Sequence, residues 1–184
     1  MTGTADHLAQ IVAHHHIRAL LVELARGEDR RDGHAISACF WPDATVNFSI
    51  FVGSFDDYLA WVVPGADSIS ATLHTLGQSL IRVRSSAATV ETHVTAYHRI
   101  DFGTEVHDVF LGGRYIDELE QRDGVWRIAR RTMIYDWSKD LGTTTDFSQG
   151  LMGMPFLRGH PVGMAHDDPS NAFFGGDPSV TRTD

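Results

Sequence analysis

Residues 112–137 read "GGRYIDELEQRDGVWRIARRTMIYDW", which is two strand-like runs on either side of the turn signal "RDG" at 122–124. Both runs contain the β-branched and aromatic residues that favour extended backbone. An Asp-Gly pair between two such runs is typical of a hairpin. The stretch therefore predicts two long antiparallel strands.

The same pattern extends upstream of this hairpin. The runs "TLHTLGQSLIRVRS" (72–85) and "ATVETHVTAYHRIDF" (88–102) are also rich in β-branched and aromatic residues, and a short turn signal follows each of them. Together the four runs predict an antiparallel meander of long strands. Gly77 and Gly112–Gly113 fall inside strands, where a glycine can mark a β-bulge that reverses which side chains face inward.

A long helix is expected before the strands. Apolar residues recur within 6–30 at a spacing of three to four, which is the repeat of an amphipathic helix. Gly27 is a plausible stop signal for this helix. We therefore expect Asp29 to follow the helix end, in a short segment of mixed charge.

Two shorter helices and one strand are expected next. Asp32 can cap a helix that ends before Pro42, and residues 44–50 read as a strand. Ser54 and Asp57 resemble the capping box of a third helix, because a Ser followed three residues later by an acidic side chain is a common helix start.

Helices followed by a long antiparallel sheet describe an α+β domain with its helices on one face. We expect a cone-shaped α+β barrel over residues 1–138, with the N-terminal helices packed into a strongly curved, mostly antiparallel sheet that leaves a pocket. Residues 139–184 turn rich in Gly, Pro, Asp and Met. This irregular tail is too apolar for a free linker, and we expect it to pack on the domain or on a neighbouring subunit.

Composition and charge exclude several classes of partner. The formal net charge is −9, with 15 basic against 24 acidic residues, which disfavours nucleic acid and anionic membranes as partners. The sequence has no apolar run of about 18 residues and no signal-peptide pattern at its start, so we expect a cytoplasmic protein without a membrane span. A single cysteine, Cys39, excludes an intramolecular disulfide. A neutral small molecule is the easier partner.

Two histidines stand on apolar strand faces. Alternation along residues 88–102 places His98 on the apolar face and His93 on the polar one. His74 lies in an apolar run of the preceding strand. An inward histidine costs desolvation and needs a hydrogen-bond partner. Each is either a core histidine with such a partner or a group that moves protons.

An arginine and an aspartate complete the set of candidates. Alternation along residues 125–137 places Arg131 among apolar neighbours, where it needs an acceptor, either in a structural ion pair or on a substrate oxygen. Asp29 taken alone reads as a solvated helix end. If that end points into the cone, Asp29 can accept the Nδ1 proton of a histidine, which fixes the tautomer and raises the basicity of the ring.

Metal and cofactor signatures are missing from the sequence. The three consecutive histidines at 14–16 point in directions about 100° apart on a helix and cannot converge on one ion. Phosphate-binding glycine loops and dinucleotide fingerprints are also absent. We therefore expect neither a metal nor a cofactor.

With this order of elements, the chain resembles the SnoaL-like branch of the nuclear transport factor 2-like superfamily. The resemblance rests on the hairpin at 112–137 and on "EDRRDGHAISACFWPDATV" (28–46), and it covers residues 5–138. The resemblance implies the cone fold. It also implies a cofactor-free lyase with a His–Asp dyad, because the chain is similar to the hexachlorocyclohexane dehydrochlorinases, scytalone dehydratases and bile-acid 7α-dehydratases of this branch.

Carried over residue by residue, the resemblance implies that the dyad is Asp29 with His74. It also implies an active-site role for Arg131, by similarity to the dehydrochlorinases, and for His98, by similarity to the second histidine of the scytalone dehydratases. The pattern departs at Leu24, where relatives carry a lysine or a tyrosine. That difference argues against dehydrochlorination of the same substrate.

The expected function is β-elimination, most simply of water, from a largely apolar cyclic substrate such as a hydroxylated steroid or polyketide. The alternatives are an isomerase or aldol-type cyclase that uses the same base, and a non-enzymatic domain that binds hydrophobic ligands. The resemblance also implies a homotrimer, in which the C-terminal segment helps to cover a pocket.

Overall fold

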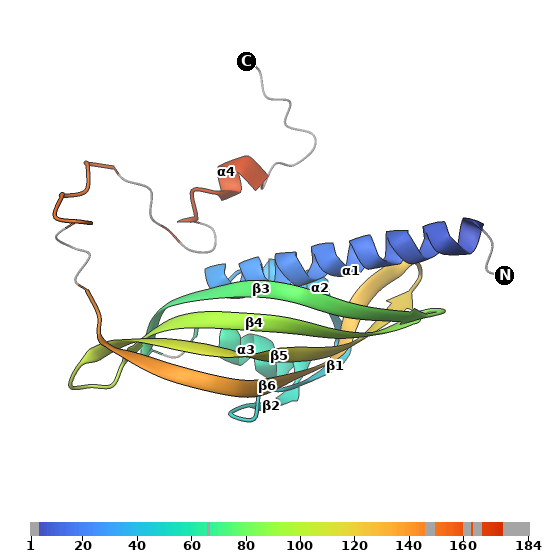
Figure 1. Cartoon of the computed structure of the whole chain (residues 1–184), viewed down its shortest axis with the longest axis horizontal. Coiled ribbons are helices and arrows are strands. Elements are labelled where there is room, and N and C mark those ends of the chain that lie inside the picture. Colours follow the sequence, from blue (N-terminus) through green and yellow to red (C-terminus); the bar gives the residue numbers. More distant parts are fainter. Residues whose placement is uncertain (1–3, 66, 146–149, 160–162, 164–166, 175–184) are drawn as a thin grey trace, which may run out of the picture. The chain divides into compact units, whose positions relative to one another are not determined.

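The computed structural model of the chain describes residues 4–65, 67–145, 150–159, 163 and 167–174 (Figure 1). The chain divides into two compact units, residues 1–144 and residues 145–184. The predicted boundary at residue 138 falls inside the last strand of the first unit, which continues to Thr143. Each unit is described by itself.

The described part of the first unit has three helices and six strands in an α+β order. In chain order these are α1 (Thr4–Arg30), α2 (Gly33–Cys39), β1 (Phe40–Asn47), β2 (Val52–Ser54), α3 (Phe55–Val62), β3 (Ile69–Arg84), β4 (Ala87–Asp101), β5 (Val106–Arg122) and β6 (Val125–Thr143). The second unit contains the short helix α4 (Asn171–Phe174). The predicted fold class is therefore confirmed in the order of its elements.

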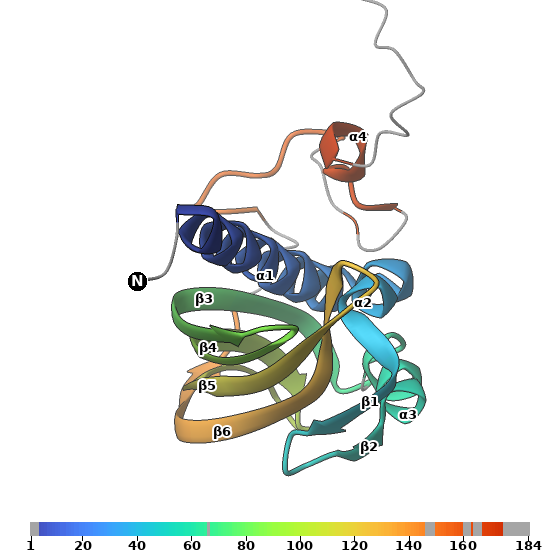
Figure 2. The same ribbon diagram turned by 90° about the vertical axis from the view of Figure 1, so that its right-hand side faces the viewer.

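The strands form one strongly curved sheet in the order β2-β1-β6-β5-β4-β3 (Figure 2). All neighbouring strands are antiparallel except β1 and β6, which run parallel. The sheet does not close into a barrel, so β2 and β3 are its edges. Helix α1 packs against β3 and α2, and α3 packs against β1.

Regular periodicity explains the core. In α1 the buried side chains recur every three or four residues, at Ile17, Leu21 and Leu24. They meet the inward residues of the sheet, which include Val90 of β4 and Leu119 of β5. The curvature of the sheet around one helix brings residues from distant parts of the sequence into one interior.

The predicted stop at Gly27 is wrong, because α1 continues to Arg30. A Cβ at Gly27 would lie 3.1 Å from the Ile36 side chain and 3.2 Å from that of Ala35, so the glycine serves the close approach of α2. The helix ends at Arg31, whose φ of 54° is left-handed. The Asp32 amide then donates to the Gly27 carbonyl, a common helix terminus.

The two predicted helix caps are present. Asp32 accepts hydrogen bonds from the amides of His34 and Ala35 at the start of α2. Ser54 accepts from the Asp57 amide at the start of α3. Helix α2 ends three residues before Pro42, which lies within β1, and the pairing of β1 with β6 is interrupted between Phe40 and Thr45.

The predicted side-chain alternation holds on β4 but not over the whole of β6. Trp126 and Ile128 are buried in the first part of β6, whereas Arg131 and Met133 are buried further on. A register shift opposite Glu118 and Leu119 of β5 skips Ala129 and reverses the alternation. The predicted face that joins Val125, Arg127 and Ala129 to Arg131 is therefore wrong for these first three residues. Register shifts also occur at the two predicted places, between Leu76 and Ser79 and between Gly112 and Gly113.

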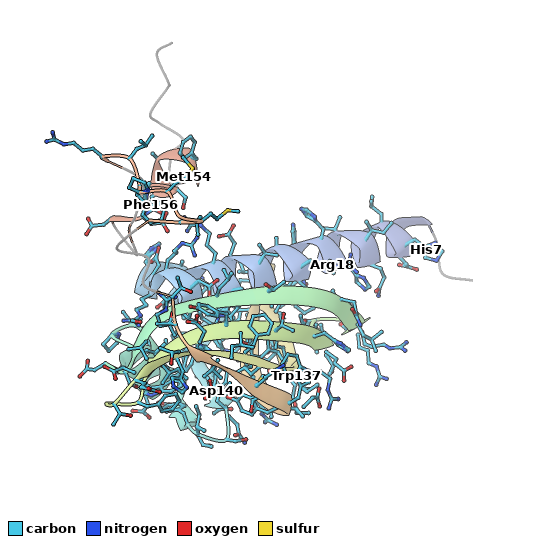
Figure 3. All side chains as sticks on the ribbon, turned by 60° about the vertical axis from the view of Figure 1, so that its left-hand side comes forward. His7, Arg18, Trp137, Asp140, Met154 and Phe156 are labelled. Carbon is cyan, nitrogen blue, oxygen red and sulfur yellow. The ribbon has the colours of Figure 1, made fainter. Side chains whose placement is uncertain are left out.

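The second unit is largely irregular in the part that the structure describes. Its apolar side chains are mostly exposed in the single chain; these are Leu151, Met152, Met154, Phe156, Leu157 and Phe173, two of which are labelled in Figure 3. The Phe174 side chain lies outside the described residues. The packing of this segment on the domain or on a neighbouring subunit stays a prediction. Within the described residues, none of the helices is long and apolar enough to cross a membrane.

Candidate active site

The inner face of the curved sheet lines an open cavity of about 590 Å³ within the first unit. Its volume lies in the range of pockets that bury drug-sized ligands, roughly 300–1,000 Å³. The wall is contributed by the end of α1, by α3 and by β3 to β6. The polar lining residues include Glu28, Tyr58, Thr72, His74 and His98, and the apolar or aromatic ones include Phe48, Trp61, Ile100, Leu111, Tyr115, Met133 and Trp137. Polar side chains thus gather toward α1, β3 and β4, and much of the remaining wall is apolar.

His74 and Asp29 are in direct contact at the edge of this cavity. His74 Nδ1 lies 2.7 Å from Asp29 Oδ1, and the side chains are 14% and 5% exposed. The backbone amide of His74 also donates to both carboxylate oxygens, at 3.0 and 3.1 Å. Among the described residues, His74 Nε2 has no hydrogen-bond partner. With Nδ1 held as the donor to Asp29, Nε2 is the ring nitrogen that can accept a proton.

The extension of α1 past Gly27 places Asp29 at this point. Asp29 lies in the last turn of the helix and not in a solvated segment beyond it. That turn lies beside the edge strand β3, whose outward amides lack a strand partner. The carboxylate of Asp29 satisfies one of these amides and holds the imidazole of the same residue. One side chain therefore fixes both the strand and the ring.

The pKa of His74 lies above the ordinary value of 6.5. Burial alone would lower it, because desolvation disfavours the imidazolium. The hydrogen bond to Asp29 and the negative charge of Glu28 outweigh that effect. The ring is consequently a stronger base than an exposed histidine.

His98 lies beside His74 with the opposite electrostatic character. The two rings meet edge to face, with centroids 5.8 Å apart. Burial and the neighbouring His74 lower the pKa of His98 to about 4. Its Nδ1 and the Oγ1 of Thr72, its partner residue across β3 and β4, are buried without a hydrogen-bond partner among the described residues. His98 is therefore neutral near pH 7 and can offer a hydrogen bond but no full charge.

Arg131 is placed behind the cavity and does not line it. Its guanidinium makes two hydrogen bonds to Asp117, at 2.8 and 2.9 Å, and lies over the Tyr115 ring at 4.1 Å. Burial disfavours its charge, but the Asp117 carboxylate raises the pKa of Arg131, so the charge is kept. The sequence left open whether Arg131 pairs with a carboxylate or with a substrate oxygen. In the structure its partner is the Asp117 carboxylate, in a structural ion pair.

Glu28 also lines the cavity, although it was not among the residues predicted for the site. It is 5% exposed, accepts a 2.6 Å hydrogen bond from the Tyr58 hydroxyl, and lies 3.6 Å from Arg131 Nη1. A signal was available, because position 28 continues the buried spacing of Ile17, Leu21 and Leu24 along α1. The predicted stop at Gly27 hid that continuation.

Metal ligation is not indicated by the described part of the chain, where no group of three or more His, Cys, Asp or Glu side chains is arranged to hold an ion. The three histidines at 14–16 follow one another along α1. Cys39 is buried and free, and burial raises the pKa of its thiol to about 12.

Comparison with known proteins identifies the family. The model of the SnoaL-like domain matches residues 9–132, which is more than half of the chain. The chain belongs to the SnoaL-like family. No curated protein matches it in sequence.

Solved structures similar to this SnoaL-like chain include lyases. A type 2 hexachlorocyclohexane dehydrochlorinase superposes with a TM-score of 0.68 at 17% identity, covering 74% of this chain and 93% of that one. A putative scytalone dehydratase from Novosphingobium aromaticivorans gives 0.64 at 23%, covering 73% and 91%. A type 3 dehydrochlorinase from Novosphingobium barchaimii gives 0.65 at 18%, covering 82% and 98%. At these identities the likeness shows a shared fold.

Replacing Asp29 tests the pairing in this SnoaL-like domain. In Asp29→Asn the amide can still accept from the His74 backbone, but its NH₂ group favours the tautomer with the proton on Nε2, which cannot act as a base. We expect a large loss of rate, on the order of 10²-fold or more. The carboxylate raises the pKa of His74 in the wild type. The acidic limb of kcat/KM against pH should therefore move to lower pH in the variant.

The measurement is a pH–rate profile of wild type and Asp29→Asn on a substrate identified from a panel of hydroxylated steroids and polyketide-like alcohols. An unchanged acidic limb together with an unchanged rate would show that Asp29 does not act on His74 during turnover.

Proposed function

We propose that the protein is a cofactor-independent lyase that eliminates water from a largely apolar, cyclic, hydroxylated substrate such as a steroid or polyketide. The observation that carries the proposal is a histidine with a raised pKa, held at Nδ1 by Asp29, in the wall of a large and mostly apolar cavity. Family membership and the two kinds of lyase neighbours support this class of reaction.

His74 is the general base in this proposal. Its Nε2 takes a proton from carbon, the C–H electron pair forms the new C=C bond, and the C–O bond breaks. The departing hydroxyl takes up a proton and leaves as water, so no oxidant or reductant is needed. Asp29 stabilises the imidazolium that forms when His74 accepts the proton.

The proton for the leaving hydroxyl comes most directly from the same imidazolium. His98 has a pKa of about 4, so near neutral pH it holds no extra proton to give. As a neutral ring it can instead donate a hydrogen bond to the departing or carbonyl oxygen of the substrate. Arg131 acts from behind the wall, by partly balancing the charge of Glu28.

A panel of hydroxylated steroids and polyketide-like alcohols tests the proposal. We expect at least one member to lose the mass of one water with wild-type protein and to stay unchanged with His74→Ala, as followed by mass spectrometry. A product of unchanged mass that depends on His74 would replace elimination by isomerisation or cyclisation. Tight binding with no conversion of any member would identify a binding domain.

The homotrimer and the cytoplasmic location expected from the sequence stay predictions. The exposed apolar side chains of the second unit, among them Met152 and Leu157, support an assembled form in which such surfaces are covered.

A further inference from the structure

In the proposed elimination Glu28 acts only through its effect on the pKa of His74 and makes no contact with the substrate. Its side chain is 4% exposed, it lies in the cavity wall, and its Oε1 accepts the Tyr58 hydroxyl proton at 2.6 Å. Its Oε2 has no hydrogen-bond partner among the described residues. Oε2 is not among the fully buried polar atoms that lack a partner, so it is accessible from the cavity, where a water or a ligand can donate to it.

The nearby guanidinium of Arg131 does not supply the missing hydrogen bond to Glu28. Arg131 directs Nε and Nη2 at Asp117, and its Nη1 remains 3.6 Å from Glu28 Oε1, too long for a good hydrogen bond. Burial and the charge of Glu28 raise the pKa of Tyr58 well above its usual range, so the phenol keeps its proton and remains a donor to Oε1. The free acceptor on Oε2 is therefore available to a ligand.

The charge around this end of the cavity is negative. Glu28, Asp29 and Asp117 supply three carboxylates, against two guanidiniums when His74 is neutral, those of Arg31 in the cavity wall and of Arg131 behind it. A ligand carboxylate placed here would be repelled in a partly buried site, where charges are poorly screened. An ammonium would face the guanidinium of Arg31 in the cavity wall and would lose its hydration against a largely apolar surface. A neutral hydroxyl avoids both penalties and supplies the missing donor.

We propose that Glu28 is a substrate-binding residue that accepts a hydrogen bond from a retained hydroxyl group of a neutral substrate and excludes substrates with a carboxylate at that end. This deepens the proposed function and rests on it only in placing the substrate in this cavity. The hydroxyl is a retained one, because Glu28 is placed as a hydrogen-bond acceptor, as it already is for the Tyr58 hydroxyl, and not as a proton donor to a leaving group. The substrate therefore carries at least two oxygen functions, one bound by Glu28 and one near His74.

Three fused-ring probes of similar shape test the charge preference by direct binding: 2-naphthol, 2-naphthoic acid and 2-naphthylmethylamine. Isothermal titration calorimetry near neutral pH would give the dissociation constant of each. We expect wild-type protein to bind the naphthol on the order of 100-fold more tightly than the naphthoate, the size expected for one buried unit charge about 6 Å away. The amine should also bind more weakly than the naphthol.

Glu28→Gln is the decisive variant, since it keeps the shape and one acceptor but removes the charge. We expect the naphthoate to gain and the naphthol to lose affinity, so that their ratio falls roughly tenfold or more. Glu23→Gln removes the same charge from an exposed position of the same helix and should leave the ratio unchanged. A ratio that is the same in Glu28→Gln and wild type would overturn the proposal.

The wild-type ranking is itself a test, which remains available if Glu28→Gln does not fold. Tightest binding of the naphthoate would show that the site is not anionic toward ligands, and tightest binding of the amine would make it a cation site; either result overturns the hydroxyl assignment. Binding does not require turnover. A Glu28-dependent preference without any dehydration would keep this inference and remove the proposed function, and dehydration without the preference would do the reverse.

Discussion

His74→Ala should lower kcat/KM by roughly 10²–10⁴-fold, the contribution of a well-placed general base. The fold should survive the change, because the backbone amide of His74, and not its ring, makes two of the three contacts with Asp29. Circular dichroism and the midpoint of urea unfolding would verify this. The rate is measured on the substrate that the dehydration panel identifies.

His93→Ala is the matched control for this experiment. His93 lies on β4, the strand beside His74, but its side chain is 49% exposed. The His93→Ala substitution removes an imidazole from the same sheet but does not alter the cavity wall. We therefore expect this variant to turn over substrate at the wild-type rate. Equal rates for His74→Ala and wild type would exclude His74 as the base, whereas equal losses in both variants would point to a general effect on the sheet.

Asp117→Asn should destabilise the protein by about 3–5 kcal/mol, the usual result of leaving one partner of a buried ion pair uncompensated. Asp117 is fully buried, and both of its oxygens accept from Arg131, which is itself 2% exposed. In the variant, Arg131 keeps only the more distant Glu28 as a charged partner. Urea unfolding followed by circular dichroism would measure the loss.

An exposed arginine–aspartate pair that also has two hydrogen bonds provides the comparison. Arg122 makes two hydrogen bonds to Asp43, at 2.8 and 3.1 Å, on the outside of the same sheet. Asp43→Asn should leave the unfolding midpoint almost unchanged, because exposed ion pairs are weakened by water and salt. If Asp117→Asn were no more destabilising than Asp43→Asn, the buried pair would not stabilise the fold in the way described.

The strands and the caps were predictable because each depends on local signals. The composition of β3 to β6, the Asp-Gly turn before Val125, and the caps at Asp32 and Ser54 all act over a few residues. The inward position of His98 followed from strand alternation, which is uninterrupted along β4. Where a bulge intervenes, as at Ala129, alternation fails, because one extra residue reverses every side chain beyond it.

The rest of the site depends on contacts between distant segments. Gly27 resembled a helix stop because its close approach to Ile36 cannot be seen in the local sequence. Because the helix was predicted to end at Gly27, Glu28 was expected to lie outside it and its burial was not predicted. The ion pair of Arg131 with Asp117 could not be predicted either, because no local feature of the sequence around Asp117 distinguishes an ion-pair partner from a residue that is not in contact with Arg131.

The position of His74 on an edge strand has a consequence for assembly. Its amide points away from β4 toward Asp29, in the direction where a seventh strand would add. A strand from another chain that paired with this stretch of β3 would compete with the carboxylate for the same N–H group and would release the imidazole from its orienting partner. Any oligomer of the active protein must therefore leave this part of the sheet border unpaired. The helix end that orients the His74 ring also protects the border from edge-to-edge aggregation.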